Sequence, residues 1–153
     1  MKKLIDIYQK FVDYLDIPKD LFLLFVRVYW GWLFFQAGFG KFTHLDRTTK
    51  FFDSLGLPVP EIFAPFIASI ETIGGILLIL GILSRLTGLV LAGNMFGAFL
   101  VAHREALASI ISDPNSFYTA LPFTFLMASL IVFFCGGGRF SVDYIFKKKF
   151  LNQ

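Results

Sequence analysis

The sequence is poor in charge and in cysteine. Of its 153 residues only 16% are charged and 56% are hydrophobic, and the mean hydropathy is +0.70. A water-soluble domain of this length carries a larger charged share, so the composition argues against a soluble protein. Cys135 is the single cysteine, which excludes an internal disulfide and a CxxC dithiol. Any redox role therefore needs another electron carrier.

The sequence also lacks the short motifs of several enzyme classes. It contains no Ser/His/Asp triad pattern, no phosphate-binding loop and no dinucleotide fingerprint. Its net charge of +3 is small, and part of it is gathered in the run from Lys147 to Lys149. A basic run beside an apolar segment is typical of a topology signal near anionic lipid, so we expect no nucleic-acid binding.

Long apolar runs are what the sequence has in abundance. Each is close to the roughly 20 residues that a helix needs to cross the hydrocarbon layer. The runs are continuously apolar, whereas the strands of a membrane barrel would alternate. We therefore predict four transmembrane helices, over residues 21–42, 62–83, 86–102 and 117–135.

The remaining segments complete a single membrane domain over residues 1–153. From Leu4 to Leu15, apolar residues recur at helical spacing among Lys and Asp. This pattern predicts an interfacial amphipathic helix over residues 3–17, ended by Pro18. Only a Ser-Arg pair separates the second and third spans, so these helices must be antiparallel. The predicted fold is all-α: a four-transmembrane-helix bundle with an N-terminal interfacial helix.

The basic residues predict the orientation of the bundle. If the N-terminus is cytoplasmic, most Lys and Arg lie on the inner side, and only Lys41, Arg47, Lys50 and Arg104 lie outside. The positive-inside rule then favours a bacterial inner-membrane protein with both termini in the cytoplasm.

Small residues favour close helix contacts. The segment GNMFG places Gly93 and Gly97 at GxxxG spacing on the third span. Small residues let helix backbones approach in lipid. Two interpretations remain open: close packing within one bundle, or a face for a homo-oligomer.

Four polar residues lie inside the apolar runs: Arg27, Gln36, Glu71 and Asn94. An Arg or Asp near the centre of a span costs about 2.5 to 3.5 kcal/mol, so a partner is expected. We predict a buried network of Arg27, Glu71 and Asn94. In one interpretation Arg27 merely neutralises Glu71 and docks two helices. In the other, the network lines a pocket for a headgroup, a proton or a quinone carbonyl.

Both histidines fall at the predicted outer face. His103 ends the third span, and His44 lies in the first outer loop with Asp46 and Glu61. Two histidines with carboxylates suffice for a divalent metal or for proton transfer near neutral pH. Their spacing matches no closed metal motif, so surface histidines remain the alternative. Trp30, in the first span, could stack on a flat ring, although packing in the bilayer also explains it.

Five sequence blocks resemble, in order, those of the DoxX family of small four-helix membrane proteins: RVYWGWLFFQAGFGK, FFDSLGLPVPE, ASIETIGGILLILGILSRL, NMFGAFLVAHREALASIISDP and GGGRFSVD. The resemblance covers Leu23 to Asp143. The family's name comes from a subunit of a thiosulfate:quinone oxidoreductase, and other members are described as partners of redox or oxidative-stress proteins. Fold transfers between relatives better than function does.

The resemblance implies which residues occupy family motif positions: Arg27, Lys41, Glu71, Gly74, Gly75, His103, Ser141 and Asp143. The segments YWGW and HREALASIISDP look like the branch encoded beside biosynthesis genes for modified, copper-binding cysteine peptides, which suggests a copper response. The segment CGGGRF departs from relatives that often have a Gly-Pro-Gly turn there, which puts the end of the fourth helix in doubt.

These observations lead to one functional hypothesis and two alternatives. The hypothesis is a quinone-linked oxidoreductase subunit, in which Arg27, Glu71 and His103 are the candidate catalytic residues. The candidates for cofactor binding are Asn94, Gln36, Trp30 and Lys41, and those for a metal are His44 and His103. The first alternative is a non-catalytic membrane adaptor for a redox or peptide-maturation partner. The second is a small transporter, which would need to oligomerise.

Overall fold

The computed structural model describes residues 2–150, with side chains from Pro18 onward. The described residues form eight helices and no strand. The helices are α1 (Lys2–Thr43), α2 (Leu45–Ser54), α3 (Pro60–Leu80), α4 (Ser84–Ala102), α5 (Arg104–Ala108), α6 (Pro114–Tyr118), α7 (Leu121–Cys135) and α8 (Val142–Phe150).

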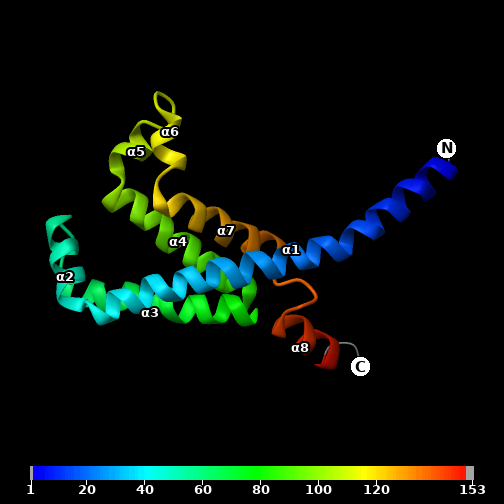
Figure 1. The fold of residues 1–153 in the computed structure, drawn as a ribbon, viewed down its shortest axis with the longest axis horizontal. Helices are drawn as coiled ribbons and strands as arrows, with labels where there is room; N and C mark the ends of the chain where they lie inside the picture. The colour runs from blue at the N-terminus through cyan, green and yellow to red at the C-terminus, as the bar shows by residue number, and fades with distance from the viewer. Residues whose placement is uncertain (1, 151–153) are drawn as a thin grey trace.

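The long helices pack as an antiparallel bundle. α1 lies against α3, and α4 lies against both α3 and α7 (Figure 1). Gly81 ends α3 in the left-handed conformation, and the N–H groups of Gly81 and Ile82 reach back to the Leu77 carbonyl at 2.8 and 3.0 Å. This glycine cap reverses the chain at once, so the predicted antiparallel pairing of α3 and α4 is confirmed. α2, α5 and α6 lie at one end of the bundle, the α2 end, and α8 lies at the other, the α8 end.

Three helices are long and apolar enough to cross a membrane: residues 18–43 of α1, α3 and α4. α7 is equally apolar but has 15 residues, a length of about 22 Å against a hydrocarbon layer of roughly 30 Å. The predicted span over 117–135 is therefore wrong at its start. α6 ends at Tyr118, and Pro122 fixes the first turn of α7 after a break. The predicted class, a helical membrane bundle, is confirmed.

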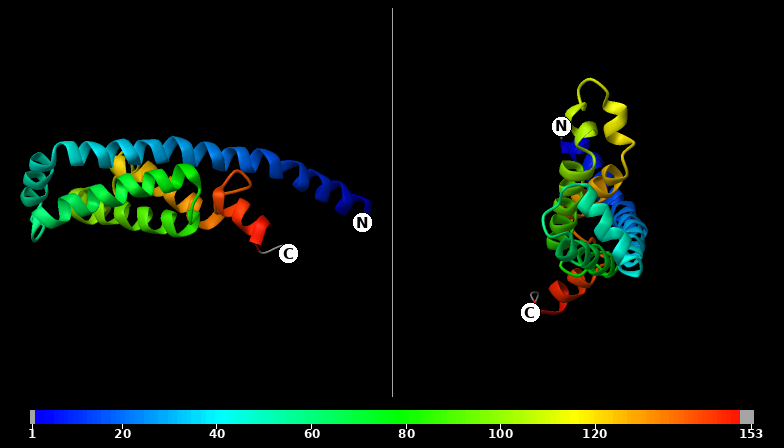
Figure 2. Two further views of the ribbon diagram at one scale, coloured as in Figure 1. Left: turned by 90° about the horizontal axis from the view of Figure 1, so that it is seen from below. Right: turned by 90° about the vertical axis from the view of Figure 1, so that its left-hand side faces the viewer.

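α1 continues through Pro18 instead of ending there. Proline removes one helical hydrogen bond, but its φ is compatible with a helix, so the rest of the ladder persists. Figure 2 shows α1 as one gently curved rod that projects beyond the bundle at the α8 end. The predicted end of a separate helix over residues 3–17 is thus wrong. The predicted amphipathic face of that segment lies on side chains outside the described residues.

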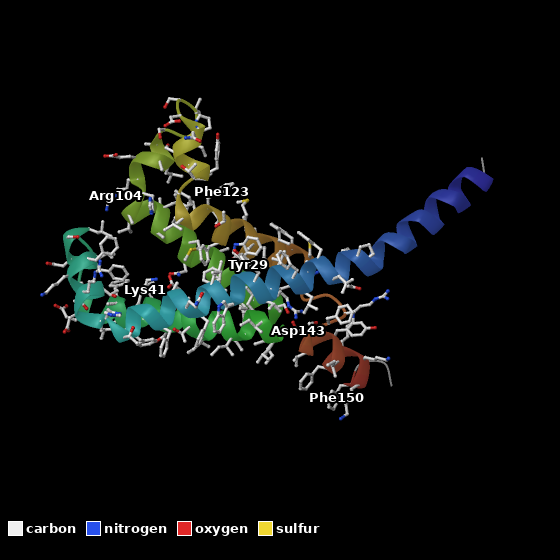
Figure 3. The ribbon with its side chains drawn as sticks, in the orientation of Figure 1. Tyr29, Lys41, Arg104, Phe123, Asp143 and Phe150 are labelled. Carbon is white, nitrogen blue, oxygen red and sulfur yellow. The ribbon has the colours of Figure 1, made fainter. Side chains whose placement is uncertain are left out.

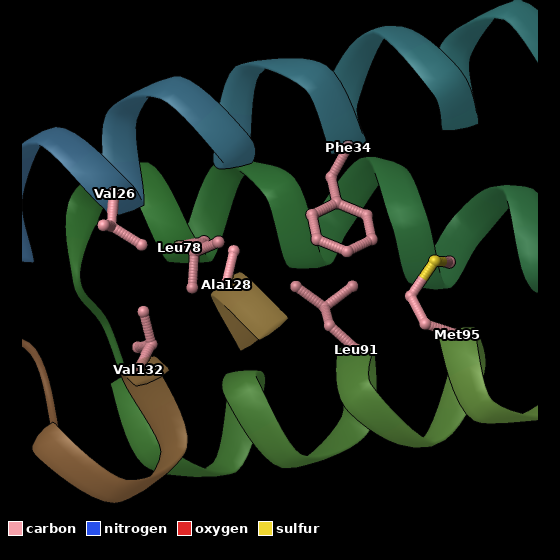
Figure 4. Packing of buried hydrophobic residues seen from close by; sticks show 7 residues of the cluster. All are labelled: Val26, Phe34, Leu78, Leu91, Met95, Ala128 and Val132. Atoms are coloured by element: carbon pink, nitrogen blue, oxygen red, sulfur yellow. The ribbon is translucent and has the colours of Figure 1, made fainter. Parts of the chain in front are cut away.

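The core of the bundle is built from small and large apolar side chains of four helices. They are Val26 and Phe34 of α1, Leu78 of α3, Leu91 and Met95 of α4, and Ala128 and Val132 of α7 (Figure 4). Phe34 also meets the Phe125 ring edge-on, with centroids 4.7 Å apart. Many large apolar side chains elsewhere on the long helices are exposed, such as Trp32 and Phe66, as expected of helices that face lipid.

Glycine allows α1 and α3 to touch through their backbones. A Cβ added to Gly75 would lie 2.6 Å from the carbonyl oxygen of Gly31, a distance that real Cβ contacts do not reach. The expectation of close packing is confirmed for this contact. Gly93 and Gly97 on α4 differ, because a Cβ at either position would meet nothing within 4 Å. Close packing within the bundle is therefore the wrong explanation for the GxxxG pair.

Candidate functional site

Arg27 is buried at the α8 end, where its two terminal nitrogens donate to backbone carbonyl groups and its Nε has no hydrogen-bond partner. Its exposed fraction is 1%. The guanidinium donates to the carbonyl oxygens of Gly137, of Phe140 at 2.8 Å and of Ile79 at 3.3 Å. Ile79 belongs to the last turn of α3, whose carbonyls lack helical partners, and Gly137 and Phe140 lie between α7 and α8. We call these contacts the Arg27 clamp, since they tie three segments together.

Two aspartates fix the same segment between α7 and α8. Asp143 accepts the N–H groups of Leu83 and Ser84, each at 2.7 Å, and so caps the start of α4. Its charge also acts on the neighbouring Arg27 of the clamp. Asp20 accepts the N–H of Arg139 at 3.1 Å and faces the guanidinium of Arg139 at 3.2 Å. The GGGRFSVD block is therefore a structural closure of the α8 end.

The structure separates Arg27 from Glu71, which corrects the predicted network. The clamp meets α3 at Ile79, about 12 Å along the helix from Glu71. The Ile79 carbonyl at the end of α3 and the Gly137 and Phe140 carbonyls after α7 accept the hydrogen bonds of the arginine, so it does not reach the acid. We did not predict from the sequence that aspartates, Asp20 above all, hold the segment between α7 and α8. A buried guanidinium requires several acceptors, and the Gly-rich turn followed by Arg and Asp offers such acceptors, so this segment could have been proposed as the partner of Arg27.

Glu71 is the acid of a second polar cluster, in the middle of α3. It is 4% exposed, accepts a hydrogen bond from the Asn94 amide at 3.2 Å, and forms an ion pair with the Lys41 ammonium. Lys41 reaches inward from the last turn of α1, and 28% of its side chain remains exposed. We call these three residues the Glu71 cluster. The structure thus keeps the predicted pairing of Glu71 with Asn94 and replaces Arg27 by Lys41.

The Glu71 cluster stands in the wall of an apolar cavity at the α2 end. The cavity has a volume of 690 Å³ and is lined by α1, α2, α3, α4 and α7. Its aromatic lining residues are Phe34, Phe51, Phe52, Phe63, Phe66 and Phe125. Gly93 and Gly97 also line it, which explains the open space beside them. Apolar walls with a few convergent polar groups are typical of sites for small ligands.

His103 lies where the cavity meets a polar cleft. The cleft is lined in part by Arg104, Glu105, Ser109 and Asp113, and it shares Leu55, Val101, Ala102 and His103 with the cavity. Figure 3 shows Lys41 and Arg104 toward this end of the molecule, opposite Asp143 and Phe150. Of the four residues shared by the cavity and the cleft, His103 is therefore the one with a titratable side chain.

The residues predicted to hold a metal do not assemble into a site. His44 is exposed before α2, with Nδ1 3.0 Å from the Thr43 hydroxyl and 3.2 Å from the Gly40 carbonyl oxygen. It does not belong to the lining of the cavity or of the cleft. Among residues 18–150, whose side chains the structure describes, no three His, Cys, Asp or Glu side chains form a group that could hold a metal ion. Metal binding by His44 and His103 therefore stays a prediction.

Two predicted cofactor-binding residues lie away from the cavity. Gln36 is exposed on α1. Trp30 packs on the core and meets the Tyr29 ring edge-on, with centroids 4.8 Å apart. Gln36 is five residues from Lys41 and so lies on another face of α1, whereas Trp30 is eleven residues away, on the same side but about 16 Å nearer the α8 end. Neither belongs to the lining of the cavity. Of the predicted cofactor-binding set, the structure brings only Lys41 and Asn94 to Glu71.

The chemistry available at the cavity follows from three kinds of group. The Lys41 ammonium donates hydrogen bonds, the Glu71 carboxylate accepts them and can take up a proton, and the Asn94 amide does both. The aromatic walls offer faces for a flat ring. This arrangement suits an apolar molecule with a polar ring substituent, and it provides an acid–base group beside that substituent.

Comparisons with known proteins agree on one family. The DoxX family matches residues 22–104. The chain is 39% identical over 83 residues to "Putative oxidoreductase CatD" of Bacillus subtilis, which covers 54% of this chain and 60% of CatD. It is 30% identical over 132 residues to the inner membrane protein YqjF of Escherichia coli, covering 86% of this chain and 96% of YqjF. No solved structure shows a significant match.

The matched region contains the Glu71 cluster, Arg27 and His103. An uncharacterized membrane protein of Mycobacterium tuberculosis is also similar, at 26% identity over 136 residues and about four fifths of each chain. The sequence blocks, the helical bundle and these relatives lead to the same conclusion: the chain belongs to the DoxX family of membrane proteins.

Proposed function

We propose that this protein is a membrane subunit of a quinone-linked redox system and that it binds a quinone in the cavity. The observation that carries the proposal is the Glu71 carboxylate, buried in the wall of an apolar cavity of 690 Å³ and held by Lys41 and Asn94. The name of the relative "Putative oxidoreductase CatD" favours redox chemistry among the functions that such a cavity could serve.

The residues of the cavity fit a quinone. A quinone supplies two-electron, two-proton chemistry from a flat ring with two carbonyl groups. The phenylalanines of the lining would contact the ring and an apolar tail. Lys41 and Asn94 would donate hydrogen bonds to a ring carbonyl, and Glu71 would orient both donors through the contacts it already makes.

Protons would reach this site through His103. This residue borders both the polar cleft and the cavity, and histidine side chains exchange protons near neutral pH. Glu71 is the acid inside the cavity that could hold a proton next to the ring. Electrons would come from a partner protein, because Cys135 is the only cysteine and the chain cannot form a dithiol of its own.

The proposed membrane is the bacterial inner membrane, with the α8 end on the cytoplasmic side. The exposed basic residues at the α8 end include Arg85, Arg139 and the run 147–149. Arg47 and Lys50 on α2 and Arg104 on α5 lie at the other end. This difference favours both termini inside, by the same positive-inside rule as before.

The test is the quinone content of the purified protein. We expect near-stoichiometric quinone after purification in mild detergent, and its loss in Gly97→Leu, because that side chain would enter the cavity. Gly40→Leu is the matched control, since a Cβ at Gly40 also meets nothing within 4 Å but lies outside the cavity lining. A protein without bound quinone that also fails to bind added quinone would overturn the proposal.

The polar cleft supports a second candidate, a non-catalytic adaptor for a redox or peptide-maturation partner. Its lining carries both signs of charge, on Arg104, Glu105 and Asp113, at an end of the bundle that would face the solvent. An adaptor would recover its partner equally well with Glu71→Gln and would lose it with Arg104→Ala. The quinone-binding function predicts instead that quinone content falls with Glu71→Gln and stays unchanged with Arg104→Ala.

A further inference from the structure

Among the described residues, α8 is attached to the bundle through its first turn. The N–H of Asp143 donates to the Gly81 carbonyl at 3.1 Å, and the Asp143 carboxylate accepts the N–H groups of Leu83 and Ser84 at 2.7 Å. Beyond this turn the helix stands clear of the neighbouring helices (Figure 1). None of the residues in α8 is buried. The start of α8 is therefore placed with the bundle, and the rest of it is open to its surroundings.

One face of α8 is apolar and exposed. Ile145, Phe146 and Phe150 are 61%, 60% and 63% exposed, and their spacing places them on one side of the helix. The rings of Phe146 and Phe150 stack with centroids 5.6 Å apart, and the Lys149 ammonium lies 5.7 Å from the Phe150 centroid. Large aromatic side chains left open in this way on an amphipathic helix are typical of a membrane interface.

The charge at this end of α8 is positive. Lys147, Lys148 and Lys149 lie in its last turn, and Lys149 falls between Ile145 and Phe146 on the apolar side of the helix. The two aspartates nearest its attachment are already engaged, Asp143 by the N–H groups at the start of α4 and Asp20 by Arg139. These two acids are therefore already paired with groups other than the three lysines.

We propose that α8 lies in the membrane surface at the α8 end, with its apolar face in the headgroup–acyl boundary and its three lysines on anionic lipid headgroups. The segment that leads from Cys135 to Val142 places α8 directly after a helix of the membrane bundle, so the lipid surface is within reach. Aromatic residues mixed with lysines match an anionic bilayer surface in both chemistry and charge. This inference does not rest on the proposed function.

The test measures the depth of α8 in the bilayer with a nitroxide. Cys135→Ser removes the native thiol, and Ile145→Cys introduces the label on the full-length protein. The protein is placed in vesicles of phosphatidylcholine, with or without phosphatidylglycerol. With the anionic lipid we expect the label to become accessible to oxygen and protected from a water-soluble nickel chelate.

The lysines are tested with a triple variant, Lys147→Gln, Lys148→Gln and Lys149→Gln. At about a factor of five for each charge near an anionic surface, the ratio of docked to free α8 should fall roughly a hundredfold. Lys50→Gln on α2, at the other end, is the control and should change nothing. A label on Phe96→Cys, half-exposed on α4, should stay in lipid throughout.

Two results would overturn the inference. In the first, the label at position 145 stays accessible to the nickel chelate with both lipid compositions. In the second, spin–spin broadening appears with both compositions and no lipid-dependent change, which would mean that a second copy covers α8. If anionic lipid still protects the label in the triple variant, the three lysines do not bind the lipid headgroups.

Discussion

At the scale of single residues, the buried charges of Arg27 and Glu71 have different tasks. Arg27 serves three carbonyl groups with the fixed fork of its guanidinium, and it holds a loop in place. Glu71 instead faces a cavity and shares its carboxylate between a cation and an amide. Both are costly in lipid, but only Glu71 stands where a ligand could use it.

Loss of the Arg27 clamp should weaken the α8 end. Arg27→Leu leaves buried carbonyls without donors, at about 1–3 kcal/mol for each group, so we expect a lower thermal unfolding temperature in detergent. Trypsin should also cut faster after Arg139. Arg85→Leu, an exposed site at the same end, is the control and should behave like the unaltered protein. Unchanged stability in Arg27→Leu would contradict the assigned role.

The ion pair in the Glu71 cluster should appear as a coupling energy. Lys41→Met and Glu71→Gln each remove one partner, so each should destabilise the protein, while the double variant should lose less than the sum. We expect a coupling of about 0.5–3 kcal/mol from thermal or denaturant unfolding. Additive effects would mean that the pair contributes nothing to stability.

At the scale of helices, glycine determines which surfaces touch and which stay open. Gly31 and Gly75 bring the backbones of α1 and α3 together, whereas Gly93 and Gly97 leave room on α4. The same residue type therefore closes one helix interface and widens the cavity at another. The difference lies in what faces each glycine, and spacing along the sequence does not reveal it.

Two alanine substitutions should separate these uses of glycine. Gly75→Ala forces α1 away from α3 and should cost roughly 1–3 kcal/mol, as overpacking usually does. Gly93→Ala meets open space and improves helix propensity, so stability should stay equal or rise by about 0.5–1 kcal/mol. Equal destabilisation by both, measured by thermal unfolding, would contradict the packing described here.

The long helices α3 and α4 were predictable from the sequence, and most contacts between the helices were not. Apolar run length predicted α3 and α4 well, and turn chemistry predicted their pairing. α7 begins later than predicted because Pro122 favours the first turn of a helix. Proline does not interrupt the apolar run, so the length of that run did not reveal the later start. The partner of Glu71 could not be predicted, because depth along a helix does not say which lysine or arginine turns toward it. α2 was missed because its composition is that of a loop.

At the scale of the whole molecule, the two ends of the bundle differ in structure. The α8 end is closed by the Arg27 clamp and by aspartates that hold the chain after α7. The α2 end is hollow, with the cavity and the polar cleft meeting at His103. The bundle is thus closed at the α8 end and open at the α2 end.

The orientation of these ends can be tested with thiol labelling in intact cells. In a Cys135→Ser background, Lys50→Cys on α2 should react with a membrane-impermeant thiol reagent. Lys148→Cys on α8 should react only after the membrane is opened, because the topology proposed from the positive-inside rule has α8 in the cytoplasm. The reverse pattern would invert the proposed topology while leaving the fold unchanged.

The measurement that tests the central claim most directly is the amount of quinone bound per folded protein in Glu71→Gln and in Arg27→Lys, each purified as a monodisperse fraction. The structure places Glu71 at the cavity and Arg27 in a structural clamp at the other end. We predict that Glu71→Gln weakens quinone binding about tenfold, near 1.4 kcal/mol, while Arg27→Lys retains the binding of the unaltered protein. Loss of quinone in Arg27→Lys together with full retention in Glu71→Gln would contradict the account.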